Sequence, residues 1–316
     1  MKYVVSLLLV LGIVTITLGQ LPPPGEGFVN VEGGRIWYKV VGEGGGTPLL
    51  IIHGGPGGRS CGSIPVYSRL SDERPVIFYD QLGSGNSDRP SDTLLWQLPR
   101  FVNEIESLRN ELGLKELHIM GNSWGAALLA EYLFAKNPQG VKSVIFSGPL
   151  LSTPVWAKDA SILLSELPSA VRDTITKYEN LKVYNAPAYI AATDSFYSRY
   201  LSRNYYGATL PPECDNALEF NEDVYNYMWG PTEFTPTGTL KNFDRTSDLY
   251  TLKCPVLFIG GEFDEARPET LYKFQKLVPG SKVIILENAG HATYIDQPDK
   301  KIEAIREFLH EVELKE

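Results

Sequence analysis

The chain has 316 residues, of which 43% are hydrophobic and 21% are charged, so its composition is that of a globular protein with a full core. This length suits either one large α/β domain with an insertion or two domains. The formal net charge of −9 at pH 7 argues against nucleic acid and anionic membranes as partners. The sequence contains no Cys-x-x-Cys, His-Glu-x-x-His or Walker-type glycine motif. We therefore predict no metal and no cofactor.

The first nineteen residues differ in character from the rest of the chain. A short positive start, Met1-Lys2, precedes an apolar run over residues 3–18 that is short for a membrane span. Small residues at Thr17 and Gly19 suit cleavage after Gly19. We therefore expect a secretory signal peptide over residues 1–19 and a secreted or periplasmic protein, with no stable membrane partner after cleavage. An uncleaved N-terminal anchor is the alternative.

Hydrophobic patterns predict alternating strands and helices. An antiparallel hairpin is expected first, with strands at 28–31 and 35–41. Unbroken apolar runs, typical of strands covered on both faces, follow at 48–52, 76–79, 117–120, 144–146, 256–259 and 283–286. Helical patterns lie at 101–112, 124–136, 269–277 and 301–312. The predicted fold class is α/β, with a mostly parallel central sheet and helices on both faces.

One long segment breaks this alternation. From about residue 150 to residue 248 no strong strand pattern occurs, and Tyr, Asn, Pro and acidic residues are frequent. We predict that residues 150–248 form an inserted helical cap over the active site, in which most tyrosines are packing residues. Residues 20–149 and 249–316 then form the core domain.

The pentapeptide Gly121-Asn-Ser123-Trp-Gly125 joins a predicted strand to a predicted helix. In that context Gly-x-Ser-x-Gly is typical of a nucleophile elbow, where a sharp turn presents the serine hydroxyl. We therefore predict that Ser123 is a catalytic nucleophile, which needs a base and a group that orients the base.

The base can be found by sorting four histidines. His118 lies inside a predicted strand, His310 lies on the terminal helix, and His53 belongs to a glycine turn. His291 follows the last predicted strand, at the edge where active sites form in open α/β sheets. The predicted base is therefore His291.

The acid is less unique, because Glu262, Asp264 and Glu265 share one loop and Asp296 follows the histidine. Asp264 is favoured by its position directly after the predicted strand 256–259. It also fits the order serine, acid, histidine of α/β-hydrolases. Glu265 would point elsewhere and need another task.

A glycine run, His53-Gly-Gly-Pro-Gly-Gly58, follows the predicted strand 48–52. Such a run brings backbone N–H groups close to the nucleophile, as in the oxyanion hole of lipases. We assign the N–H groups of Gly55 and Trp124 as the two donors, with Gly54 as the alternative to Gly55.

Several motifs occur together in one order: His53-Gly-Gly-Pro-Gly57, Asp80-Gln-Leu-Gly-Ser-Gly-Asn-Ser87, Gly121 to Gly125, Gly261-Glu-Phe-Asp-Glu265 and Gly290-His291. From about residue 28 to the C-terminus the chain resembles the proline iminopeptidase family of serine peptidases. The resemblance implies an α/β-hydrolase fold with a helical cap and removal of an N-terminal residue, often proline, from short peptides. It also implies that Glu265 and Glu233, the latter in Gly230-Pro-Thr-Glu-Phe234, hold the substrate's free ammonium.

The predicted function is hydrolysis of a small peptide or aminoacyl amide through an acyl-enzyme. Buried carboxylates suit an exopeptidase, which must distinguish a free ammonium from an internal amide. Trp229 and Tyr227 are candidate walls for a ring-shaped residue. An amino-acid amidase or esterase, an acyltransferase on the same triad, and a non-catalytic secreted binding protein are the alternatives. A serine at the elbow disfavours epoxide hydrolysis, and the oligomeric state is not predicted.

Three cysteines in an exported protein favour a disulfide and leave at least one thiol free. Cys254 opens a predicted buried strand and is favoured as the free thiol. Cys61 and Cys214, expected on facing sides of the active-site mouth, are the pair to test.

Overall fold

The computed structural model describes residues 23–204, 210–215 and 217–315. The predicted signal peptide over residues 1–19 lies outside the described residues, as do Tyr205 and Tyr206 of the predicted cap. Within the described part of the chain, no helix combines the length and the apolar character needed to cross a membrane.

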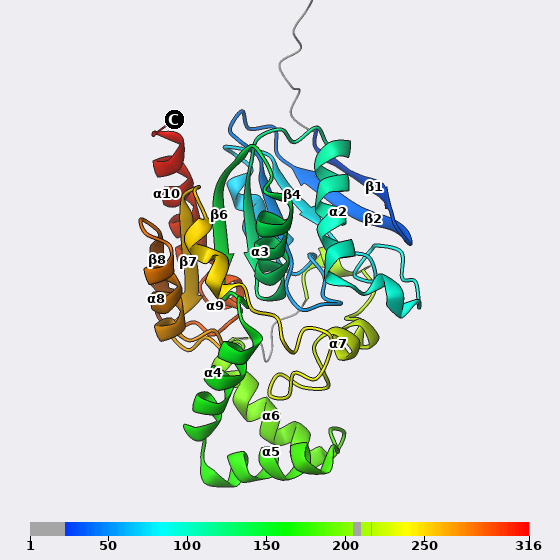
Figure 1. Cartoon of the computed structure of the whole chain (residues 1–316), viewed down its shortest axis with the longest axis vertical. Helices are drawn as coiled ribbons and strands as arrows, with labels where there is room; N and C mark the ends of the chain where they lie inside the picture. The colour runs from blue at the N-terminus through cyan, green and yellow to red at the C-terminus, as the bar shows by residue number, and fades with distance from the viewer. Residues whose placement is uncertain (1–22, 205–209, 216, 316) are drawn as a thin grey trace, which may run out of the picture.

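An eight-stranded sheet with the order β1-β2-β4-β3-β5-β6-β7-β8 lies at the centre (Figure 1). β1 pairs antiparallel with β2, and β2 pairs antiparallel with β4, while every other pair of neighbours is parallel. The predicted fold class is therefore confirmed. The strands are β1 (Gly25–Val31), β2 (Gly34–Val41), β3 (Leu49–Ile52), β4 (Val76–Tyr79), β5 (Leu117–Asn122), β6 (Val141–Ser147), β7 (Val256–Gly261) and β8 (Lys282–Leu286).

Each face of the sheet carries its own hydrophobic core. Along β3, Leu50 and Ile52 join the core on one face, whereas Leu49 and Ile51 join the core on the other, as the two-residue period of a strand requires. The first core is covered by α2 (Leu98–Glu111), α3 (Trp124–Lys136) and α8 (Pro268–Leu277). The second is covered by α1 (Ile64–Tyr67) and α10 (Pro298–Glu313).

Several elements extend beyond their predicted bounds for identifiable reasons. The helices α2, α8 and α10 begin up to three residues early, each with a proline at its first or second position. Proline is favoured there because its fixed φ suits the helix and its missing N–H is not needed. At their carboxyl ends, β5 and β7 extend through Asn122 and Gly261, because backbone pairing continues after the apolar run has ended.

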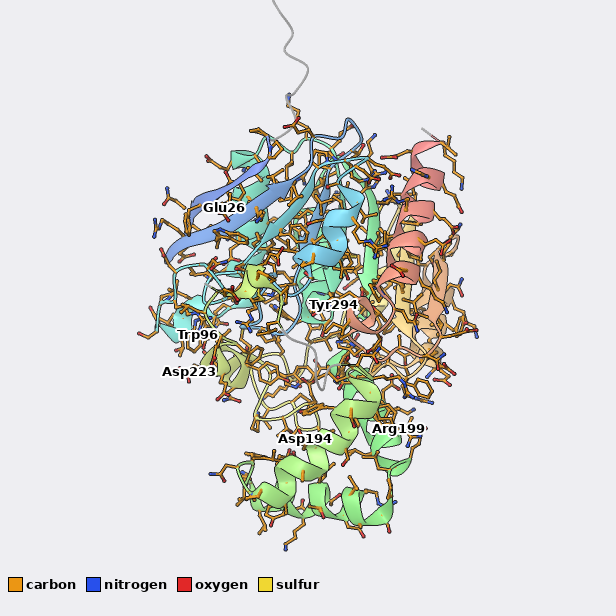
Figure 2. All side chains as sticks on the ribbon, turned by 180° about the vertical axis from the view of Figure 1, so that it is seen from behind. Glu26, Trp96, Asp194, Arg199, Asp223 and Tyr294 are labelled. Carbon is orange, nitrogen blue, oxygen red and sulfur yellow. A yellow bond between two sulfur atoms is a disulfide. The ribbon has the colours of Figure 1, made fainter. Side chains whose placement is uncertain are left out.

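In its described residues, the segment between β6 and β7 carries four α-helices and protrudes beyond the carboxyl edge of the sheet (Figure 1). Leu163, Ile175 and Phe196 belong to a small core of its own. Figure 2 shows Asp194 and Arg199 on this segment, with Tyr294 at the neighbouring edge of the sheet. The helices are α4 (Thr153–Ser165), α5 (Ser169–Leu181), α6 (Pro187–Tyr200) and α7 (Glu222–Met228).

Candidate active site

Ser123 occupies a strained turn between β5 and α3. Its backbone angles are φ 56° and ψ −120°, a combination that residues with a side chain rarely adopt. The Ser123 N–H donates to the Ser147 carbonyl over 2.9 Å, and the Ser123 carbonyl accepts from the Ala126 N–H over 2.9 Å. Strain of this kind persists only where the surroundings hold it in place, and it is characteristic of a nucleophile elbow.

The two glycines of the pentapeptide are required by close packing. A Cβ atom at Gly121 would lie 2.4 Å from the Gly125 carbonyl oxygen, and one at Gly125 would lie 2.4 Å from the Ile52 carbonyl oxygen. Any side chain at these positions would push α3 away from β3 and β5. The Gly-x-Ser-x-Gly spacing is therefore what allows the helix to begin directly behind the serine.

The loops after β7 and β8 bring Asp264 and His291 together. His291 donates from Nδ1 to Asp264 Oδ1 over 2.7 Å, and the Asp264 side chain is completely buried. The Asp264 carboxylate also accepts the N–H groups of Ala266, over 2.8 Å, and Gly261, over 3.2 Å. These bonds fix the carboxylate, which in turn fixes the tautomer and orientation of the imidazole.

Ser123 and His291 line one pocket of about 440 Å³, together with Glu233 and Glu265. Burial by itself lowers the pKa of His291, but the Asp264 carboxylate raises it, and the two glutamates add to the rise. The result is a pKa of about 9 for the imidazole. The charge of the pocket therefore controls whether the imidazole is neutral and able to act as a base.

The glycine loop after β3 is held by a side-chain network. His53 donates from Nδ1 to the Gly54 carbonyl over 2.9 Å, and its Nε2 accepts the Gln81 N–H over 3.1 Å. Gln81 donates to the His53 carbonyl over 3.2 Å and accepts from the Trp124 indole N–H over 2.8 Å. Gln81 thus connects the glycine loop to the residue that follows the nucleophile. Gln81 lies in the motif from Asp80 to Ser87, but no role was predicted for it from the sequence.

The predicted oxyanion donors lie on both sides of Ser123. Trp124 is the first residue of α3, so its N–H has no acceptor within the helix. Among the described residues, the N–H groups of Gly55 and Gly54 have no backbone acceptor either. Both glycines line the pocket, and a Cβ at Gly54 would lie 3.1 Å from the Ser123 Cβ. The alternative between Gly55 and Gly54 stays open on this geometry.

The pocket also holds two carboxyl groups. Glu265 is only 4% exposed, and its Oε1 has no hydrogen-bond partner in the described chain. Glu233 is half-buried and accepts a hydrogen bond from the Tyr225 hydroxyl. Burial raises the pKa of Glu265 well above its usual value, and the nearby Glu233 raises it further. Burial also raises the pKa of Glu233, against the hydrogen bond from Tyr225. A cation between the two groups would relieve both effects.

The other acidic candidates are engaged elsewhere. Glu262 accepts the Asn288 N–H over 2.9 Å, and Asp296 accepts the Gly290 N–H over 2.8 Å. Neither contacts the His291 ring through a described hydrogen bond, so Asp264 is the carboxylate that orients the base. Within the described ranges, no group of three or more His, Cys, Asp or Glu side chains is arranged to hold a metal ion.

The predicted pocket walls were wrong. Tyr225, Tyr197 and Phe220 line the pocket, whereas Trp229 and Tyr227 do not. Residues two apart on a helix do not face the same side, and Tyr225 and Tyr227 on α7 are such a pair. A tyrosine-rich helix therefore indicates an aromatic wall without indicating which tyrosine forms it.

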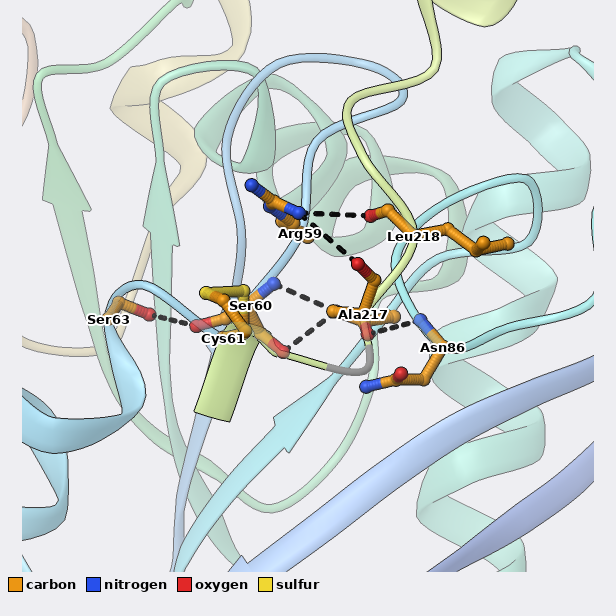
Figure 3. The surroundings of a disulfide bond; sticks show 9 residues. Arg59, Ser60, Cys61, Ser63, Asn86, Ala217 and Leu218 are labelled. Atoms are coloured by element: carbon orange, nitrogen blue, oxygen red, sulfur yellow. Dashed lines mark hydrogen bonds between the residues drawn. A yellow bond between two sulfur atoms is a disulfide. The ribbon is translucent and has the colours of Figure 1, made fainter. Parts of the chain in front are cut away.

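A disulfide fastens the segment before α7 to the core near the pocket. Cys61 and Cys214, the pair singled out for testing, form this disulfide, and Cys254 is free. Figure 3 shows Arg59 beside it, donating to the carbonyl of Leu218 over 3.2 Å and to that of Ala217 over 3.4 Å. The glycine loop and one wall of the pocket are thus tied together covalently and by hydrogen bonds.

Comparison with known proteins agrees with this geometry. The family model described as the alpha/beta hydrolase fold matches residues 47–298. A proline iminopeptidase from Heyndrickxia coagulans is 44% identical over 288 residues, covering 91% of this chain and 99% of that protein. One from Saccharolobus solfataricus is 34% identical and covers 91% of this chain and 93% of that protein.

Solved structures agree as well. The crystal structure of a proline iminopeptidase from Mycobacterium smegmatis superimposes with a TM-score of 0.82 and 29% identity, covering 92% of this chain and 99% of that one. The chain therefore belongs to the proline iminopeptidase family of α/β hydrolases.

Proposed function

We propose that this protein is a serine aminopeptidase that removes the N-terminal residue, preferably proline, from short peptides or aminoacyl amides. The observation that carries the proposal is the pair of carboxyl groups, Glu233 and Glu265, in the same pocket as Ser123 and His291. Its volume of about 440 Å³ falls within the range of small-ligand pockets. Relatives over 90% of the chain that carry the name proline iminopeptidase support the same substrate class.

The chemistry follows from the hydrogen bonds of the imidazole. Because Nδ1 of His291 donates to Asp264, Nε2 is the nitrogen left to take the proton from Ser123. The Ser123 Oγ then attacks the carbonyl carbon, and the bond to the leaving amine breaks as His291 returns the proton to that amine. Water, deprotonated by His291, attacks the resulting ester, releases the amino acid and restores the serine.

The oxyanion of each tetrahedral intermediate is stabilised by the N–H group of Trp124 and by that of Gly55 or its alternative, Gly54. Loss of one such donor costs about 3 to 4 kcal/mol of transition-state stabilisation. The strained turn fixes the backbone at Ser123 before substrate arrives, so little reorganisation there should accompany the reaction.

Specificity for a chain end follows from charge. A free α-ammonium can lie against Glu233 and Glu265, whereas the uncharged amide of an internal residue offers neither carboxylate a positive charge and leaves Glu265 Oε1 buried without a partner. We further propose that residues 150–248 act as a cap that selects the substrate, because Tyr197, Tyr225 and Glu233 come from this segment.

A dipeptide assay tests the proposed activity. Purified protein is incubated with Pro-Ala and with Ala-Pro, and released proline and alanine are separated by chromatography. We expect rapid cleavage of Pro-Ala and little of Ala-Pro. Equal cleavage of both, or of prolyl esters alone, would favour the amidase or esterase alternative. Diversion of most product to an added amine would favour an acyltransferase.

We also propose that residues 1–19 direct export and are then removed. The disulfide between Cys61 and Cys214 supports an oxidising compartment, because such bonds are rare in reducing cytosol. Expression in a bacterial host, followed by fractionation and mass measurement, tests this proposal. We expect a chain that begins at Gln20 outside the cytoplasm. A membrane-bound chain that keeps residues 1–19 would instead indicate an uncleaved anchor, and a cytoplasmic chain would contradict export.

A further inference from the structure

Lys301 is a buried charge that the mechanism above does not use. It is the fourth residue of α10, and its side chain has no exposed surface. Lysine is almost never fully buried unless it is paired. The first turn of a helix also disfavours a cation, because the helix dipole is positive there. An uncharged side chain of similar length would avoid both costs, so stability alone does not explain a lysine at this position.

Its hydrogen bond leads directly to the nucleophile elbow. Among the described residues, the Lys301 Nζ has one hydrogen-bond partner, the Ser147 Oγ, at 2.7 Å. The Ser147 hydroxyl in turn donates to the Asn122 Oδ1 over 2.8 Å. The carbonyl oxygen of Ser147 accepts the Ser123 N–H over 2.9 Å. One serine at the end of β6 thus connects the lysine to both Asn122 and Ser123.

The orientation of the Asn122 side chain depends on these hydrogen bonds. With Oδ1 held by Ser147, the Nδ2 atom of Asn122 faces the glycine loop, since a Cβ at Gly54 would lie 3.1 Å from it. Asn122 and Gly54 both line the pocket. The series of hydrogen bonds that starts at Lys301 therefore reaches the side of the pocket where the predicted oxyanion donors lie.

Gly148, which directly follows the last residue of β6, lies against the other half of the triad. A Cβ atom at Gly148 would lie 2.8 Å from the His291 ring and 3.2 Å from Asp264 Oδ2. Burial lowers the pKa of the Lys301 ammonium to about 7, and the negative charge of Asp264 opposes that fall. The residues at the end of β6 thus lie against both Lys301 and the Asp264–His291 pair.

We propose that Lys301 is a positioning residue of the hydrolytic reaction, which holds the nucleophile elbow through Ser147. The inference rests on the proposed role of Ser123 as nucleophile.

Two variants test this link from its two ends. Lys301→Met removes the hydrogen bond to Ser147, so we expect kcat to fall about 10- to 100-fold with little change in KM. The acid limb of kcat/KM should stay in place, because Lys301, with a pKa of about 7, is already neutral near pH 9, where His291 titrates. Ser147→Ala cuts the same link at the serine, so kcat should fall here too while the limb stays in place.

Thermal unfolding and a neighbouring lysine serve as controls. Lys301→Met should melt at the wild-type temperature or above it, since the buried charge is gone. Lys300→Met, on the same turn but exposed and 3.8 Å from Glu287, should leave kcat and the pH profile unchanged. Wild-type kcat in Lys301→Met would overturn the proposal. So would unchanged kcat per active site in a destabilised variant, because that result describes a structural residue.

The labelling rate of Ser123 by a fluorophosphonate keeps this test independent of the substrate. We expect Lys301→Met to label more slowly than wild type at neutral pH, whether the protein cleaves peptides or esters. Slow labelling together with a failed peptide assay would support the role of Lys301 and contradict only the proposed substrate. Labelling at the wild-type rate would contradict the role of Lys301 itself.

Discussion

Replacing Glu265 by Gln removes one charge from the proposed ammonium site without changing side-chain size. The Glu265 Oε1 has no described partner, whereas Glu233 already accepts from Tyr225, so Glu265 is the freer acceptor. A buried hydrogen bond to a charged group contributes about 1.5 to 3 kcal/mol. At 1.36 kcal/mol for each factor of ten, kcat/KM for a substrate with a free amino group should fall roughly 10- to 150-fold.

The same substitution should not weaken the fold. The raised pKa of Glu265 means that the folded state binds a proton more tightly than the unfolded state, whose carboxyl titrates near 4.5. Ionising the wild-type group therefore costs stability as the pH rises above that value. Glu265→Gln should consequently unfold at an equal or higher temperature at neutral pH. Lower activity with undiminished stability would identify Glu265 as a binding residue.

The assay compares a fluorogenic prolyl amide with its N-acetylated form. The preference for the free amine should shrink in Glu265→Gln, because only the free amine loses an ionic contact. Glu262→Gln is the matched control, since Glu262 lies in the same loop, is exposed and bonds to the Asn288 N–H. Equal losses on both substrates, or no loss, would refute the reasoning.

Four further predictions follow from the geometry. Ser123→Ala should fold normally and lower kcat by about 10⁴-fold or more. Gly148→Ala should lower kcat although it replaces no triad residue, because its Cβ would lie 2.8 Å from the His291 ring and displace it. The pKa of His291, about 9 in the free protein, should govern the acid limb of kcat/KM. The acid limb of kcat should lie at lower pH, because the ammonium of the bound substrate offsets the pocket carboxylates and so lowers the pKa of His291. Replacing Cys61 and Cys214, 153 residues apart, by serine should cost up to about 5 kcal/mol of unfolding free energy, measured by denaturant titration.

Each of these variants has a matched control. Ser195→Ala changes an exposed serine of the cap and should keep full activity. Gly280→Ala alters another glycine with positive φ, at 83°, but meets nothing within 4 Å, so it should cost stability without affecting kcat. Cys254→Ser should leave the unfolding free energy near that of the wild type. Retained turnover in Ser123→Ala, equal effects of the two glycine variants, or coincident acid limbs in kcat and kcat/KM would contradict the corresponding prediction.

The sheet and the elbow could be predicted because their signals are local. Unbroken apolar runs such as 256–259 occur in strands covered on both faces, and the glycines around Ser123 have a steric reason that any similar turn shares. The positions of Asp264 and His291 followed from the rule that sites form beyond the carboxyl ends of strands. These inferences needed only the order of the elements along the chain.

The supporting residues could not be predicted, because their roles come from contacts distant in sequence. In the sequence, Lys301 and Lys300 are two adjacent lysines at the start of an amphipathic helix, yet one is fully buried and the other exposed. Ser147 bonds to a lysine 154 residues away. Gln81 bridges two loops that only the assembled sheet brings together. Pairwise geometry of this kind leaves no periodic pattern in a single chain.

The most direct test of the account is hydrolysis of a panel of fluorogenic prolyl, alanyl and leucyl amides, each with and without N-acetylation. The account predicts that the prolyl amide is the best substrate and that acetylation abolishes its turnover, because Glu233 and Glu265 then lose the ammonium they bind. Equal turnover of acetylated amides would contradict the aminopeptidase assignment while leaving Ser123, Asp264 and His291 as the reacting groups of another hydrolase. Equal turnover of non-prolyl amides would contradict the preference for proline.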